Sequence, residues 1–191
     1  MAPRGEEQPP RLRADAARNR ARVLRAAREQ LAAGDDSLQL NTIARLAGVG
    51  VGTVYRHFPD RQALVAALSV ERFQELAEAV RAAVAEGGAA MAVLHRVARL
   101  ALSFMLEDSR LAAVLESGDG DPQVAESTAE VDAVLGALLD QARRDGAVKD
   151  TVTAADLRLL LCGVAAAVRA GGPDRAEPYL AVLLDGLRPV S

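Results

Sequence analysis

The side chains best suited to chemistry lie close together in the run AGVGVGTVYRHF, residues 47–58. Thr53 and Tyr55 offer hydroxyls that suit phosphate oxygens, while Arg56 and His57 can reach phosphates or base edges. Glycines at positions 50 and 52 keep the start of a helix slim, so its N–H groups can approach a phosphate or a base. The pattern indicates non-covalent recognition of a polyanion.

Simpler interpretations of two of these residues stay open. Tyr55 would also serve as a half-buried ring whose hydroxyl meets water. His57 would also suit the C-terminal end of a helix, where a positive charge is stabilised by the helix dipole. Neither interpretation accounts for the glycine positions together with the segregated charge of the chain.

Motifs for catalysis are missing from the sequence. It has no H-E-x-x-H, no phosphate-binding glycine loop and no nucleophile motif. His95 is a lone histidine on an apolar stretch, which is more typical of a core residue than of a catalyst. The single cysteine, Cys162, excludes an intramolecular disulfide and a multi-cysteine metal site, and we interpret it as a small buried hydrophobe rather than a redox group. We therefore expect no enzyme, cofactor or metal, and a helical enzyme is the least favoured alternative.

Charge is divided unevenly along the chain. Residues 1–61 carry 11 arginines against 7 acids, a net of +4, and the remainder carries 12 basic residues against 19 acids, a net of −7. A basic N-terminal part favours a polyanionic partner, although a solvated arginine surface is the alternative. No apolar run approaches the ~18 residues of a membrane span, and the first residues lack the apolar core of a signal peptide. We expect a cytoplasmic protein with no membrane partner.

The composition predicts the elements that position these side chains. Hydrophobic residues make up 50% of the chain and aromatic residues 3%, so Leu, Val and Ala must fill the core. Because Ala and Leu favour helices, we expect an all-α fold of about nine helices. We expect a flexible tail at 1–13, a three-helix domain at 14–60 and a helical domain at 61–191. Asp15 is the expected N-cap of the first helix, and the later helices are expected at about 40–47, 51–57, 61–85, 90–107, 109–116, 122–145, 153–170 and 175–187.

The spacing of apolar residues between 40 and 58 predicts a helix-turn-helix. Ile43 and Ala44 lie on one face of a two-turn helix, and Gly48 provides the left-handed residue that ends it. Val54 and Phe58 then point inward from the next helix. Its remaining residues form the outer surface.

The stretch LNTIARLAGVGVGTVYRHFPDRQAL closely resembles the DNA-binding signature of TetR-family transcriptional regulators, and the similarity extends back through RNRARVLRAAREQLA. The resemblance implies a dimeric, ligand-responsive regulator, usually a repressor, that binds double-stranded DNA at a pseudo-palindromic operator. The residues from DGAVKDTV to the C-terminus more weakly resemble the SbtR-like subgroup. A DNA-binding regulator without a small effector is the alternative.

Carried over by position, the resemblance assigns DNA contacts to helix 40–47, helix 51–57 and the start of the helix that follows. Arg61 matches a basic residue that meets phosphate. The sequence departs from the family at Leu31, where an aromatic residue is common, and at Gln39, a poor helix cap. The expected DNA-binding residues are Asn41, Thr42, Val51, Gly52, Thr53, Tyr55, Arg56, His57 and Arg61.

The last two helices are expected to form the dimer interface, because their apolar surface exceeds what one small core needs. The alternative is that they are core helices of a monomer. The expected dimerisation residues are Leu157, Leu160, Leu161, Val164, Val168, Leu180, Leu183, Leu184 and Leu187.

An effector pocket is expected among the helices at 61–85, 90–107 and 122–145. Ligand pockets are mostly apolar with a few orienting polar groups, and methionines adapt to varied shapes. Met91, Leu94, Phe104 and Met105 would line it, with His95 and Arg99 as polar groups that orient a ligand. The alternative is that these side chains simply pack against one another.

Overall fold

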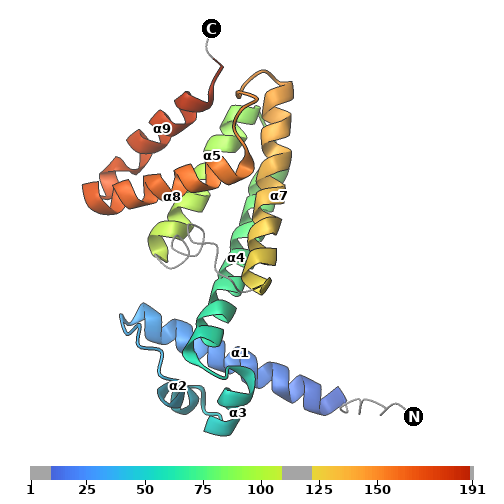
Figure 1. Cartoon of the computed structure of the whole chain (residues 1–191), viewed down its shortest axis with the longest axis vertical. Coiled ribbons are helices and arrows are strands. Elements are labelled where there is room, and N and C mark those ends of the chain that lie inside the picture. Colours follow the sequence, from blue (N-terminus) through green and yellow to red (C-terminus); the bar gives the residue numbers. More distant parts are fainter. Residues whose placement is uncertain (1–9, 109–121, 190–191) are drawn as a thin grey trace. The chain divides into compact units, whose positions relative to one another are not determined.

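The structure is a computed structural model of the 191-residue chain and describes residues 10–108 and 122–189. Every regular element in these ranges is helical, as the sequence predicted (Figure 1). The short helix expected at 109–116 lies outside the described residues. The elements are α1 (Pro10–Ala32), α2 (Leu40–Ala47), α3 (Val51–His57), α4 (Arg61–Ala85), α5 (Ala90–Glu107), α7 (Pro122–Arg144), α8 (Ala154–Gly171), the 3-10 turn η1 (Pro173–Arg175) and α9 (Ala176–Leu187).

The first helix is longer than the sequence suggested. It begins at Pro10 rather than after Asp15, so residues 10–13 are helical and the expected tail was drawn too long. Proline is well tolerated in a first helical turn, where its missing N–H has no intrahelical partner to lose. The Asp15 carboxylate pairs with Arg18 one turn further on and does not cap the helix.

The chain divides into two compact units, residues 1–68 and residues 69–191, which we call the N-terminal unit and the C-terminal unit. The division falls inside α4 and not at its start, where the domain boundary was expected. The reason is that Leu64, Ala67 and Leu68, in the first turns of α4, belong to the core of the N-terminal unit.

The core of the N-terminal unit is built where α1, α2, α3 and the first turns of α4 meet (Figure 1). Leu24 of α1, Ile43 of α2 and Val54 of α3 are completely buried. Leu31, which replaces the expected aromatic residue, is partly buried and packs against this core. The burial of one stripe from each helix fixes which face of α3 remains outside.

The C-terminal unit is a helical layer in which α5, α7 and α8 pack on one another, and α9 packs on α8 and α5 (Figure 1). Leu94 of α5, Leu139 of α7 and Leu161 of α8 are buried there. None of the helices that the structure describes is long and apolar enough to cross a membrane.

Candidate functional site

The turn between α2 and α3 adopts the geometry that its glycine predicts. Gly48 has φ 61° and ψ 40°, in the left-handed region where a Cβ is unfavourable. The N–H of Gly48 bonds to the Arg45 carbonyl at 3.2 Å, and that of Val49 bonds to the Ala44 carbonyl at 3.0 Å. Two otherwise unpaired carbonyls at the end of α2 are thereby satisfied.

Arg22 of α1 reinforces this turn, which the sequence did not reveal. Its Nη2 donates a hydrogen bond to the Gly48 carbonyl at 3.1 Å. A Cβ on Gly48 would lie 2.8 Å from the same nitrogen, so the close approach also depends on the glycine. No local sequence signal connects residues 26 positions apart, which is why this contact could not be predicted.

The faces of α3 are sorted as expected. Val54 and Phe58 are buried, whereas Val51, Gly52, Tyr55 and Arg56 are exposed. Thr53 and His57 are half-buried at the margins of the outer surface. The hydroxyl and guanidinium groups of one short helix therefore face outward from a fixed core. Their contact with DNA remains a prediction.

Arg56 lies back along α3. Its Nε donates to the Gly52 carbonyl one turn earlier, at 3.3 Å. Gly52 has no heavy atom within 4 Å of the place its Cβ would occupy, so the N-terminal end of α3 stays slim. The Arg56 guanidinium is therefore held beside Gly52, in the part of α3 that DNA could approach closely.

The start of α2 carries the other expected contacts. Asn41 is exposed and Thr42 is half-buried. Gln39, at the N-cap, has extended backbone and makes no side-chain cap hydrogen bond, as its residue type suggested.

Arg61, which was expected to meet phosphate, is exposed and bonds to the backbone of its own chain. Its Nε donates to the Ser37 carbonyl at 3.1 Å, and its Nη2 donates to the Asp36 carbonyl at 2.9 Å. Two of its donors are thus used within the protein, on the loop before α2. The contact of Arg61 with phosphate stays a prediction, and family position alone does not show these two partners within the protein.

Most of the residues expected at a dimer interface are buried inside the chain. This part of the prediction was wrong, because a side chain already packed in the protomer core is not available to a partner. The stripe on α8 that faces α5 and α7 was mistaken for the outward one. The buried residues are Leu157, Leu161, Val168, Leu180, Leu184 and Leu187.

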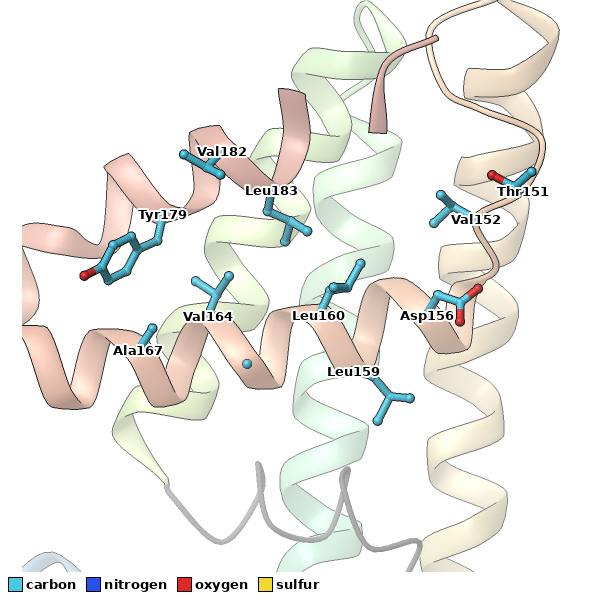
Figure 2. Close-up of a pocket in the computed structure, with 11 residues that line it drawn as sticks. Thr151, Val152, Asp156, Leu159, Leu160, Val164, Ala167, Tyr179, Val182 and Leu183 are labelled. Atoms are coloured by element: carbon cyan, nitrogen blue, oxygen red, sulfur yellow. The ribbon is translucent and has the colours of Figure 1, made fainter. Parts of the chain in front are cut away.

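The other face of α8 is also apolar and forms one wall of a groove of about 770 Å³ against α9. Leu160 and Val164 of α8 and Leu183 of α9 line it, and all three were expected at the interface (Figure 2). Leu159, Gly163, Ala167, Tyr179 and Val182 join them. Leu160 is 46% exposed and Val182 is 74% exposed. This helix therefore has apolar residues on both faces, and the described part of the chain covers only one of them.

The residues expected to line an effector pocket differ in their burial. Leu94 and Met105 are buried in the core, and Met91 and Phe104 are half-buried. His95 and Arg99 extend outward to the carboxylate of Glu177 on α9, at 3.4 Å and 3.7 Å. Their assignment as polar groups inside a cavity was wrong. The Arg72 guanidinium lies over the Phe104 ring, with its Cζ 4.0 Å from the centre of that ring.

A buried three-helix core that presents one short helix with exposed hydroxyl and guanidinium groups defines a helix-turn-helix of the DNA-binding kind. Residues 23–68 match the family of bacterial regulatory proteins called the tetR family, and residues 91–189 match the C-terminal domain of SbtR-like transcriptional regulators. The chain belongs to the TetR family of transcriptional regulators.

Solved structures agree with this assignment. A TetR regulatory protein from Mycobacterium vanbaalenii is 37% identical over 93% of this chain and 99% of its own, with a TM-score of 0.60. A TetR regulator from Streptomyces coelicolor is 29% identical over 90% and 99%, also with a TM-score of 0.60. The regulator FadR from Bacillus subtilis, solved in complex with stearoyl-CoA, is 18% identical over 88% and 99%, with a TM-score of 0.67, and shares the fold. No curated protein matches the chain in sequence.

Proposed function

We propose that this regulator binds operator DNA as a homodimer and represses transcription until a small apolar ligand releases it. The observation that carries the DNA-binding part is the outer surface of α3, where Val51, Tyr55 and Arg56 are exposed over a buried Val54. The proposed DNA surface consists of this face together with Asn41 and Thr42 of α2. In a dimer two such helices would meet half-sites about one turn apart, ~34–36 Å, on a pseudo-palindromic sequence.

The apolar groove between α8 and α9 supports the dimer. Leu160, Val164 and Leu183 are aligned along it, and a second copy of the same groove offers the same chemistry (Figure 2). Twofold symmetric interfaces are self-complementary, so an exposed apolar face of this kind suits a copy of itself. We therefore assign Leu159, Leu160, Val164, Val182 and Leu183 to the interface in place of the buried residues.

Selection of binding sites from random duplexes tests the DNA-binding part. The wild-type protein should enrich an inverted repeat, and its affinity should fall by ~10³-fold or more between 50 and 200 mM salt if six or more phosphates are contacted. Enrichment of no sequence, or binding that does not depend on salt, would contradict the proposal.

The effector part rests on the family and on the apolar interior of the C-terminal unit. A ligand shifts DNA affinity only by its differential binding to the two arrangements of the dimer. A FadR relative carries stearoyl-CoA, so long-chain acyl compounds are the first probes to try. Such a probe should raise the Tm of the free protein and release the selected duplex in a fluorescence anisotropy titration.

A regulator without a small effector is the second candidate. The outward contacts of His95 and Arg99 with Glu177 favour it, because they leave the expected pocket without its polar groups. A panel of acyl compounds that neither raises the Tm nor releases the duplex would support this candidate over the first.

A further inference from the structure

The loop between α1 and α2 is held in a conformation that L-residues rarely adopt. Leu38 has φ 47°, and no other non-glycine residue in the described part of the chain has a positive φ. A backbone of this kind is strained and persists only where its surroundings hold it. The Leu38 side chain is 1% exposed and packs in the core of the N-terminal unit, which anchors the end of the loop.

Asp35 stabilises the first half of the loop through its carboxylate. Its carboxylate accepts hydrogen bonds from the backbone N–H of Ser37 at 3.0 Å and from Nε2 of the buried Gln30 at 2.5 Å. The bond from Gln30, followed by those from Ser37, lowers the pKa of Asp35, so the carboxylate stays ionised and remains an acceptor.

Arg61 holds the second half of the loop from α4. Its Nε and Nη2 donate to the neighbouring carbonyls of Ser37 and Asp36. A guanidinium is a planar fork that presents two donors in fixed geometry, so it defines the position of both carbonyls at once. The Asp60 carboxylate caps the first turn of α4, which carries Arg61, by accepting from the Ala63 N–H at 2.8 Å.

The start of α2 depends on this loop. The helix has eight residues, and its N-cap, Gln39, contributes no side-chain hydrogen bond. Short helices are marginal in isolation, so the first turn of α2 relies on its buried Leu40 and on the segment before it. Asn41 and Thr42, which belong to the proposed DNA surface, lie in the first turn of α2.

We propose that Arg61 is a positioning residue for DNA binding. It ties the first turn of α4 to the loop that sets the start of α2, and it does not act as a phosphate ligand. The assignment rests on the proposed function, since it concerns how the DNA-binding surface is held. It also implies that a change in the direction of α4 is passed to α2 through one side chain.

Two substitutions separate this role from a phosphate contact. Arg61→Lys keeps the charge but loses the fork, and Arg61→Gln loses both. The probes are the duplex selected by the wild-type protein and a scrambled duplex of the same length, titrated by fluorescence anisotropy between 50 and 200 mM salt at 15 °C. Gln62→Ala, at the next exposed position of α4, is the control for a change at this surface.

Both Arg61 variants should bind the selected duplex about tenfold more weakly, the effect of losing one charge-assisted hydrogen bond. The slope of log affinity against log salt should not change, because no phosphate contact is lost. Affinity for the scrambled duplex should change less, so the ratio of specific to non-specific affinity should fall. Gln62→Ala should bind like the wild type.

Three results would overturn the assignment. A lysine variant that binds normally, beside a glutamine variant whose salt slope falls by about 0.9 per lost contact, would make Arg61 a phosphate ligand. Variants that are folded by circular dichroism and bind normally, with only a lower Tm, would leave Arg61 a purely structural role. A wild-type protein that selects no duplex would overturn the proposed function and this assignment with it.

Discussion

Tyr55 shows what the outer face of α3 offers to a ligand. This residue is 45% exposed. Val54 beside it is completely buried, so the backbone that carries Tyr55 cannot turn away. Because this backbone is fixed, the exposed Tyr55 side chain carries its hydroxyl to the outer side of α3. This is what a contact to a phosphate oxygen requires.

Tyr55→Phe removes this hydroxyl and little else. We expect the selected and the scrambled duplex to lose affinity by a similar factor, about 2- to 10-fold, because phosphate contacts position the protein without reading sequence. The Tm should not change, since the hydroxyl is outside the core. Fluorescence anisotropy with both duplexes measures the effect, and unchanged affinity would show that the hydroxyl meets only water.

Gly48 and Gly52 make a matched pair of glycine substitutions. Gly48→Ala forces a Cβ onto a left-handed residue and toward Nη2 of Arg22, so the free energy of unfolding should fall by about 1–2 kcal/mol. Gly52→Ala meets no atom within 4 Å and should raise the free energy of unfolding by up to about 1 kcal/mol.

Urea denaturation of the two glycine variants, beside the wild type, measures these changes. Operator affinity should fall for Gly52→Ala all the same, because its Cβ thickens the end of α3 that approaches DNA. Equal stability of the two variants would contradict our account of the turn.

At the scale of elements, local patterns predicted which segments are helices and where most of them end. The bounds of α2, α3 and α4 follow from Gly48, from Pro59 and from the apolar periodicity, all of which are local signals. The face that a helix turns toward its own core is harder to predict when both faces are apolar. Leu157 and Leu160 lie three residues apart on α8, yet one is buried and the other lines the groove.

Long side chains set a second limit on prediction. The sequence places Arg61 and His95 on particular helices but does not say what they reach. The partners of Arg61 are 24 and 25 residues away, and Glu177 is 82 residues from His95. Such contacts depend on how the helices pack. The candidate DNA surface was therefore predictable from local sequence, and the effector pocket was not.

The start of α8 is stabilised by a capping box whose strength depends on pH. Thr153 Oγ1 accepts from the Asp156 N–H at 3.1 Å, and the Asp156 carboxylate accepts from the Thr153 N–H at 2.9 Å and from its hydroxyl at 2.7 Å. The hydrogen bond from the Thr153 side chain, then that from its backbone, lowers the pKa of Asp156 below the ordinary 3.8.

A lowered carboxyl pKa stabilises the folded state above pH 3.8 and stops doing so as the pH falls through the folded value. The wild type should therefore exceed Asp156→Asn in free energy of unfolding near neutral pH, and the difference should shrink below pH 3.8. Urea denaturation of both proteins from pH 3 to 7 measures it. A difference that stays constant with pH would contradict this assignment.

At the scale of the whole molecule, one face of α8 is buried and the other lines an exposed groove. One face closes the core of the C-terminal unit, and the other is left for the proposed partner. Substitutions on the two faces should therefore have different effects. This makes the oligomeric state testable without unfolding the chain.

Leu160→Glu combined with Val182→Glu places charges in the groove and should give a monomer in light scattering with normal helicity. Leu161→Ala on the opposite face is the control. It should remain a dimer while losing about 2–5 kcal/mol of stability, because it leaves a cavity in the core. A double variant that is still dimeric would refute the α8–α9 interface.

In the proposed dimer, the exposed apolar face of α8 would make the behaviour of this regulator depend on its own abundance. In the proposed dimer that face is buried only when two chains meet, so part of the stability is governed by mass action. The Tm should rise with each tenfold increase in protein concentration and should stop doing so in the Leu160→Glu, Val182→Glu variant. Dilution would dissociate the dimer, which would both lower the stability of the fold and separate the two recognition helices. Occupancy of an operator would then rise more steeply than in proportion to the number of chains.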